Sequence, residues 1–153
     1  MLRPGVSFLR VWAISFQEPV MLERAFDVPE KPADVIASVR DLDFSDLCVQ
    51  IEGYWDLWLF EERWELKPVP VTFYGKGPDF EDDYDDHVRI DFGIDSIYMP
   101  QEGLPDTVRK SKSNLTSLMR YVHSLDDALP VAERRLWVDN ESGTFTVPDW
   151  AMD

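Results

Sequence analysis

The chain has 153 residues, of which 44% are hydrophobic, including six Trp, nine Phe and five Tyr, so it can bury the core of one ordinary domain spanning residues 1–153. Thirty acidic residues face fifteen Lys and Arg, giving a formal net charge of −15. This charge excludes nucleic-acid binders, whose affinity comes from clustered cations. The sequence has no apolar run of membrane-spanning length and no apolar core of a signal peptide, so we expect a cytoplasmic protein.

The sequence up to residue 40 predicts a hairpin followed by a short helix. Apolar residues alternate through a predicted strand with one face formed by Val6, Phe8, Trp12, Ile14 and Phe16. A second alternating run over residues 20–28 follows three turn-like residues, which is typical of an antiparallel hairpin. Pro32 then begins a helix over about residues 32–40, because proline at the first helical position loses no hydrogen bond.

Short strands and one long helix follow. Gly and Pro residues separate five further predicted strands, at residues 47–52, 55–66, 69–74, 87–92 and 96–99. Pro70, within one of these runs, predicts an edge strand. Between residues 106 and 129, leucines recur at three- and four-residue steps, which predicts an amphipathic helix with Asp106 as its N-cap. A last pair of runs, residues 135–138 and 144–147, is compatible with another hairpin.

Together these elements predict an α+β fold. We expect one mainly antiparallel sheet of about five to seven strands, with the long helix and the short helix packed on it.

Almost all of the net charge lies in the middle of the sequence. Residues 41–106 contain eighteen acids and four bases, and residues 79–86 alone contain six carboxylates. An EF-hand loop starting at Asp79 would need glycine where Tyr84 stands and glutamate where Ile90 stands, so that motif is excluded. A calcium site of another kind, a merely solvated loop, and pairing with the cations at residues 109–112 remain open.

Aromatic residues accompany these acids and favour a further interpretation, a docking surface for a basic protein. Aromatic side chains supply contact area at interfaces, and clustered carboxylates steer association with a positive surface. We therefore predict a non-catalytic acidic binding protein with no cofactor. The predicted partner-binding residues are Asp79, Phe80, Glu81, Asp82, Asp83, Tyr84, Asp85, Asp86, Trp58, Glu62 and Trp64.

In size and composition the chain resembles the acidic immunity proteins that neutralise basic toxin enzymes such as nucleases. The resemblance implies an inhibitor whose surface mimics the charge of a polyanion. A DNA-mimic protein, which presents carboxylates in place of phosphates, belongs to the same physical class.

Two other classes of function stay open. His87, Arg89 and Asp91 would share one face of a strand, where they could bind a small molecule or serve a hydrolase. An aromatic strand face could instead be buried in a homo-oligomer. The single cysteine, Cys48, lies in a predicted half-buried strand, and no metal or nucleophile motif is present, so the sequence does not favour an enzyme.

Overall fold

The computed structural model describes residues 2–135, which form two compact units. The first, the sheet unit, comprises Leu2–Asp56 and Pro68–Gly93. The second, the helix unit, comprises Leu57–Lys67 and, within the described residues, 94–135. Each unit is described by itself below. The second predicted hairpin, at residues 135–147, lies outside the described residues, Arg135 excepted.

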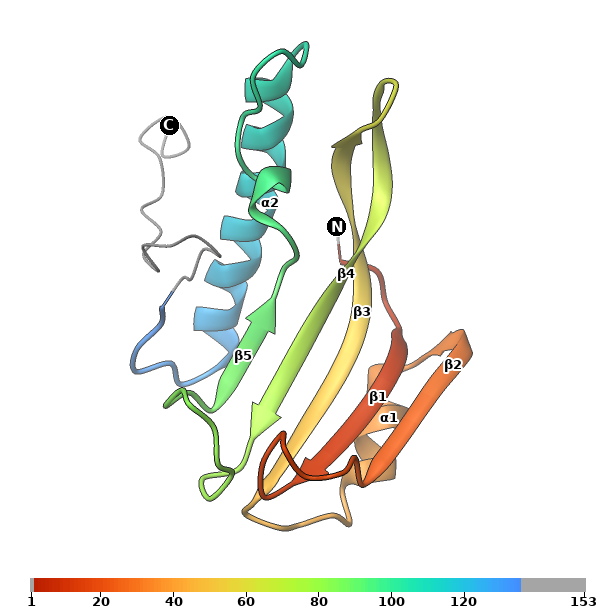
Figure 1. Cartoon of the computed structure of the whole chain (residues 1–153), viewed down its shortest axis with the longest axis vertical. Coiled ribbons are helices and arrows are strands. Elements are labelled where there is room, and N and C mark those ends of the chain that lie inside the picture. Colours follow the sequence, from red (N-terminus) through yellow and green to blue (C-terminus); the bar gives the residue numbers. More distant parts are fainter. Residues whose placement is uncertain (1, 136–153) are drawn as a thin grey trace. The chain divides into compact units, whose positions relative to one another are not determined.

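Within residues 2–135 the fold is α+β, as predicted, with one antiparallel sheet and two α-helices (Figure 1). The strand order is β2-β1-β3-β4-β5. The strands are β1 (Val6–Ala13), β2 (Leu22–Glu30), β3 (Leu47–Phe60), β4 (Trp64–Lys76) and β5 (Val88–Asp91). The helices are α1 (Pro32–Val39) and α2 (Thr107–Ala128), with a 3₁₀ turn, η1 (Asp95–Ile97), before α2. Both helices therefore begin and end within about two residues of their predicted bounds.

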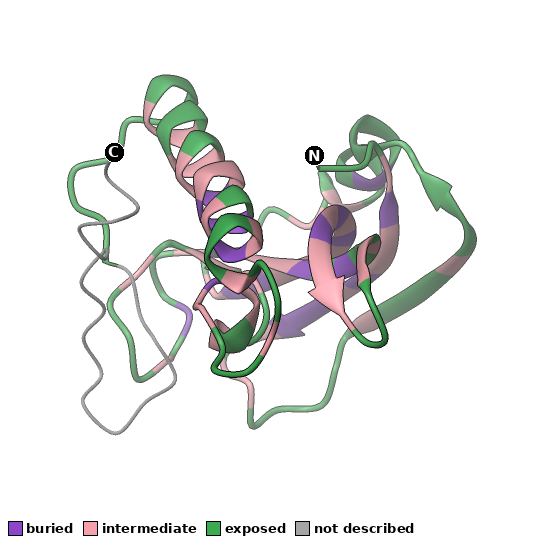
Figure 2. Cartoon of the chain, turned by 90° about the horizontal axis from the view of Figure 1, so that it is seen from above, coloured by how far each residue is buried: buried purple, intermediate pink, exposed green. Residues whose placement is uncertain are grey.

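Apolar side chains pack on both faces of β1 and β3 in the sheet unit. Figure 2 marks the buried residues of the chain in purple. On one face, α1 contributes Val35 to a cluster with Val6, Leu9, Val11 and Leu47. On the other face, Trp12, Cys48 and Phe80 are buried together, with Phe16 and Tyr74 packed against them. Because successive side chains of a strand point to opposite faces, Val11 and Trp12 belong to different clusters.

The predicted face of the first strand is wrong for a local reason. The pairing of β1 with β2 is irregular between Val6, which lies opposite Glu30, and Phe8, which lies opposite Ala25. Regular alternation would put Val6 and Leu9 on opposite faces of β1. Instead Val6 belongs to the same cluster as Leu9, and Trp12 belongs to the other. The strand also ends at Ala13, because Ile14 adopts a left-handed backbone (φ 71°).

The predicted strand over residues 55–66 is a hairpin instead. β3 runs unbroken through Gly53 to Phe60, the chain reverses at residues 61–63, and β4 begins at Trp64. The predicted strand at 96–99 is likewise wrong, since this segment forms η1 and its C-cap.

The prediction that Pro70 lies on an edge strand is also wrong, because β4 lies between β3 and β5. However, β5 pairs only with Thr72–Gly75 of β4. Pro70 lies beyond this segment, so its missing N–H breaks no bond with β5.

In the helix unit, an asparagine joins α2 to the hairpin. Asn114 is 1% exposed, and its Oδ1 accepts a hydrogen bond from Trp58 N at 2.8 Å. Its Nδ2 donates to Trp58 O and to Ile97 O, both at 2.8 Å. Asn114 therefore pairs with the backbone of Trp58 as a neighbouring strand would. Among the described residues, no helix is long and apolar enough to cross a membrane.

Candidate functional site

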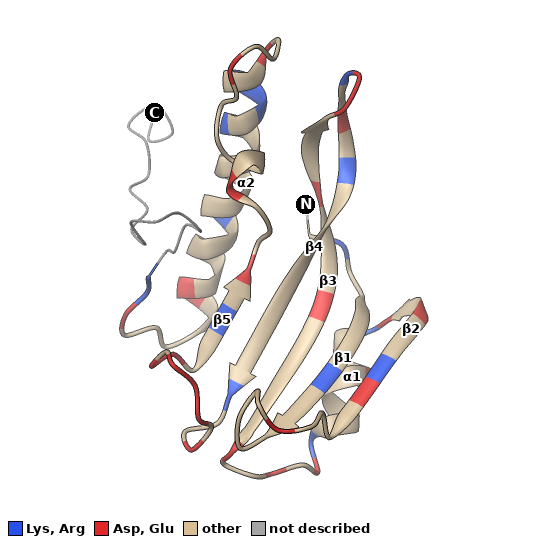
Figure 3. Cartoon of the chain, viewed as in Figure 1, with Lys and Arg blue, Asp and Glu red and all other residues tan. Residues whose placement is uncertain are grey.

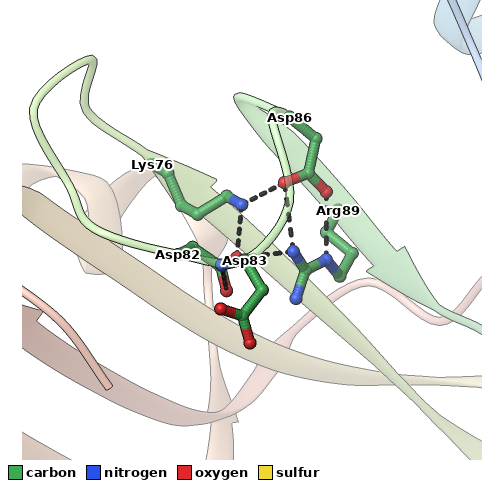
Figure 4. Close-up of polar contacts among 5 residues, drawn as sticks. All are labelled: Lys76, Asp82, Asp83, Asp86 and Arg89. Carbon is green, nitrogen blue, oxygen red and sulfur yellow. Dashed lines mark hydrogen bonds and ion pairs between the residues drawn. The ribbon is translucent and has the colours of Figure 1, made fainter. Parts of the chain in front are cut away.

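The acidic loop between β4 and β5 is organised around two cations (Figure 4). Lys76 Nζ donates to Asp82 Oδ2 at 2.7 Å and also pairs with Asp86. Arg89 donates to Asp82 Oδ2 at 2.5 Å through Nη2 and to Asp86 Oδ2 at 3.0 Å through Nε. We call these four residues the ion-pair cluster. The Lys76 side chain is 3% exposed and that of Asp82 is 10% exposed, so the loop folds over a buried ammonium group.

The cluster holds both of its carboxylates in the charged form. Burial by itself raises the pKa of Asp82, but the hydrogen bonds from Lys76 and Arg89 outweigh burial, and the pKa is lowered. Burial acts in the same direction on the pKa of Asp86, and the hydrogen bonds from Arg89 and Lys76 again lower it. Two of the six acids at residues 79–86 are therefore charged and paired with cations inside the fold.

The other four carboxylates of this run, those of Asp79, Glu81, Asp83 and Asp85, are exposed to solvent. The two aromatic residues of the run differ in their exposure. Phe80 is buried beside Phe16, with ring centroids 4.9 Å apart, and belongs to the core. Tyr84 is exposed, and the Arg89 guanidinium lies over its ring at 4.5 Å.

Two further loops of the sheet unit join this one, so that three loops form one surface. We define the three-loop surface as residues 14–21, 41–46 and 77–87. Backbone hydrogen bonds connect them: Ile14 N donates to Asp46 O at 2.8 Å, Glu81 N to Ile14 O at 2.7 Å, and Asp79 N to Ser45 O at 3.0 Å.

Gly77 permits the close approach of two of these loops. A Cβ at residue 77 would lie 2.1 Å from Ser45 O and 2.7 Å from the Ser45 carbonyl carbon, both backbone atoms. Such distances are far below van der Waals contact, so only glycine fits without a shift of the backbone.

Ile14 lies at the junction of the three loops in an unusual conformation. A positive φ is rare for a β-branched residue, because its Cβ crowds the backbone. Hydrogen bonds on both sides of the residue, to the 41–46 loop and from the 77–87 loop, hold it there. The side chain is 47% exposed, so the strained residue presents its apolar atoms to solvent.

The three-loop surface is acidic throughout and partly apolar. The loops contain one, three and six acidic residues in chain order, and no lysine or arginine. In Figure 3 the connection from β4 to β5 is drawn largely in the colour of acids. Between these carboxylates, several large apolar or aromatic side chains are exposed: Ile14, Val20, Met21, Phe44 and Tyr84.

The other predicted partner-binding residues lie in the helix unit. Trp58 is half-buried, and Lys110 Nζ lies 3.1 Å from the centroid of its ring. Trp64 Nε1 donates to Pro105 O at 2.6 Å, and its ring packs against Phe60 with centroids 5.3 Å apart. Glu62 is exposed in the turn between β3 and β4. Both tryptophans thus make contacts within their own unit.

The three residues of the predicted small-molecule site, His87, Arg89 and Asp91, make separate contacts. Arg89 belongs to the ion-pair cluster, and Asp91 Oδ1 accepts a hydrogen bond from Gly93 N at 2.9 Å. His87 is exposed, and its backbone oxygen accepts a hydrogen bond from Lys76 N. These bonds direct Arg89 and Asp91 to internal partners.

Cys48 is a buried thiol, and the part of the chain that the structure describes contains no candidate metal site. Burial raises the pKa of the Cys48 thiol to about 11, which keeps it protonated and unreactive at neutral pH. Within residues 2–135, no group of three or more His, Cys, Asp or Glu could hold a metal ion.

Comparison with protein-family models, curated proteins and solved structures found no match to this chain.

Proposed function

We propose that this chain is a non-catalytic binding protein that docks on a basic protein partner through the three-loop surface. The observation that carries the proposal is the joining of three acidic loops, free of lysine and arginine, around an exposed isoleucine held in a strained conformation. Backbone strain persists only where the surrounding structure enforces it, and it is concentrated at functional sites.

The surface combines the two properties that an interface with a basic protein needs. Its outward carboxylates attract a positive surface over a distance set by the Debye length, about 8 Å at physiological ionic strength, and so accelerate encounter. Its exposed apolar side chains, Ile14 and Phe44 among them, can then be buried against the partner, which contributes most of the binding free energy.

The ion-pair cluster and the core limit which residues of the acidic run are available to a partner. Asp82, Asp86 and Phe80 are held by contacts inside the sheet unit, so they shape the loop. Asp79, Glu81, Asp83 and Asp85 remain for the partner.

Two variants of equal charge test this proposal. The surface variant changes Asp79, Glu81, Asp83 and Asp85 to Asn or Gln. The control variant changes four exposed acids outside the surface: Asp27, Glu30, Glu102 and Asp127. Each variant removes four charges, from −15 to −11, so a difference between them reports where the charges lie.

The measurement is affinity capture from native lysate at low and high salt, with the retained proteins identified by mass spectrometry. We expect a basic protein on the wild-type and control columns at low salt, its loss at high salt, and its loss from the surface variant at either salt. The proposal is wrong if the wild type retains no basic protein, or if both variants retain it equally.

A further inference from the structure

The anchors of the acidic loop differ along its length. Residues 77–81 are held by backbone hydrogen bonds, from Glu81 N to Ile14 O at 2.7 Å and from Phe80 N to Gly77 O at 3.2 Å, and by the burial of Phe80. None of these contacts depends on a titratable side chain. Residues 82–86 are held at both ends by carboxylates, those of Asp82 and Asp86, which bind Lys76 and Arg89.

We propose that the ion-pair cluster is an acid-released latch: protonation of Asp82 and Asp86 frees residues 82–86, while residues 77–81 stay anchored. The latch would regulate the docking surface, and that consequence rests on the function proposed above. The opening itself is a property of the chain alone.

Lys76 drives the opening. Its ammonium group is almost completely buried, and a buried cation is tolerated only when a counter-charge and hydrogen bonds replace its water shell. When Asp82 and Asp86 become neutral, the ammonium loses both counter-charges. It regains hydration if the segment above it moves away, so the protonated state favours the open loop.

The groups that face the two carboxylates come from three strands and from the loop. They are Lys76 of β4 and Arg89 of β5, with the buried Cys48 thiol of β3 coupled electrostatically to all four cluster residues. Within the loop, Asp83 N donates to Asp82 Oδ1 at 2.8 Å, and the Tyr84 ring lies beneath the Arg89 guanidinium. His87 contacts the cluster through its backbone carbonyl, which accepts from Lys76 N at 2.8 Å.

The direction of the pH dependence follows from the two carboxylates. Their pKa values are lowered in the closed loop relative to the ordinary value of about 3.9 for Asp. The two carboxylates therefore stabilise the closed loop fully at pH values above that ordinary value. This stabilisation is lost as the pH falls through the lowered pKa values.

Nuclear magnetic resonance on the isolated, isotope-labelled full chain tests the latch without any partner. Between pH 7 and about pH 2.5, side-chain carboxyl ¹³C shifts report the protonation of each Asp, and backbone ¹⁵N relaxation reports order on the fast timescale. We expect residues 82–86 to lose order as Asp82 and Asp86 titrate, while residues 77–81 and Trp12 keep theirs.

Substitution of the cluster cations supplies the second readout. In Lys76→Met we expect the pKa values of Asp82 and Asp86 to rise, but the loop to stay ordered when they titrate, because no buried ammonium remains to be rehydrated. Arg89→Gln keeps the buried ammonium, so it should raise both pKa values and open the loop at higher pH. It also serves if Lys76→Met does not fold, because Arg89 is partly exposed. Lys67→Met, which removes only the exposed contacts with Glu61 and Glu65, is the control and should change neither.

The latch is refuted if residues 82–86 stay ordered when both carboxyl groups are protonated, or if residues 77–81 lose order in the same step. Partner capture plays no part in these measurements. A failed latch therefore leaves the docking proposal standing, and a chain without a partner can still show the latch.

Discussion

At the scale of single residues, the backbone conformation of Ile14 lowers the stability of the fold. A left-handed backbone costs a residue with a Cβ about 1–2 kcal/mol, and a β-branched side chain adopts it least readily. Asparagine tolerates this conformation much better, because its short polar side chain can bond locally.

We therefore predict that Ile14→Asn does not lower the free energy of unfolding, because relief of about 1–2 kcal/mol of backbone strain offsets the lost apolar contacts. The matched control is Ile36→Asn, which is 51% exposed and lies in α1, where no strain is relieved. That change should lower stability by about 1 kcal/mol. Chemical denaturation of both variants gives the comparison, and an equal loss in the two would contradict strain at Ile14.

Gly77 provides a second residue-scale prediction. In Gly77→Ala the new Cβ would collide with the Ser45 backbone, so we expect a loss of about 1–3 kcal/mol, the range for overpacked sites. Gly75→Ala is the control, since a Cβ there meets no atom within 4 Å. The difference between their denaturation midpoints measures the clash, and equal midpoints would argue against a close approach of the two loops.

Part of the ion-pair cluster could be predicted from the sequence. Lys76 and Arg89 are the only cations between Pro68 and Val108, and they flank the acidic run on both sides. This placement indicates internal pairing more strongly than the distant cations at residues 109–112. The identity of the two buried acids depends on the path of the loop, and no local pattern distinguishes Asp82 and Asp86 from their neighbours. The strain at Ile14 depends on bonds to two other loops and left no trace in the sequence.

At the scale of elements, Asn114 joins α2 to the β3–β4 hairpin within the helix unit. Its side chain satisfies both backbone groups of Trp58 and the carbonyl of Ile97. Leaving a buried polar group without a partner costs about 1–3 kcal/mol.

We predict that Asn114→Ala lowers the free energy of unfolding by about 3 kcal/mol, because more than one group loses its bond. Ser113→Ala, an exposed neighbour on the same helix, should change it by less than about 0.5 kcal/mol. Amide hydrogen exchange gives a sharper test. The Trp58 amide should lose protection in Asn114→Ala alone, and retained protection would mean that another group can replace the asparagine.

Helices were easier to predict than strands in this chain, for physical reasons. Pro32 and the leucine spacing of α2 act within a few residues, so the sequence alone locates both helices. The reversal at residues 61–63 contains two glutamates and an arginine, and no Gly, Pro, Asn or Asp announces it. The irregular pairing of β1 with β2 after Val6 depends on the partner strand, so alternation within β1 cannot reveal it.

Asp106 was predicted as the N-cap of the long helix, and it occupies that position. However, it makes no side-chain capping bond. Its carboxylate pairs with Arg109, and the hydrogen bond from that guanidinium lowers its pKa. The position of the cap was thus predictable, and its chemistry was not.

At the scale of the whole molecule, the net charge is −15, and the excess carboxylates repel one another. Added salt shortens the Debye length from about 30 Å at 0.01 M to about 8 Å at 0.15 M, so it relieves this repulsion. Salt also weakens exposed ion pairs, but each contributes only about 0–1 kcal/mol, and the buried cluster is screened less.

We therefore predict that the melting temperature at pH 7 rises between about 10 mM and 150 mM NaCl. The surface variant with a net charge of −11, described above, should show a smaller rise, because less repulsion remains to be screened. Scanning calorimetry at both salt concentrations measures this, and a melting temperature that falls with salt would mean that exposed ion pairs dominate.

The ion-pair cluster also constrains how this sequence can vary over evolutionary time. A mutation that removes the charge of Asp82 leaves the buried Lys76 with Asp86 as its remaining partner in the cluster, so positions 76, 82, 86 and 89 are expected to change together. The exposed acids at 79, 81, 83 and 85 do not belong to the ion-pair cluster and do not balance the buried Lys76. A lineage could therefore acquire a new partner by altering those four positions one at a time, without passing through an unfolded intermediate sequence.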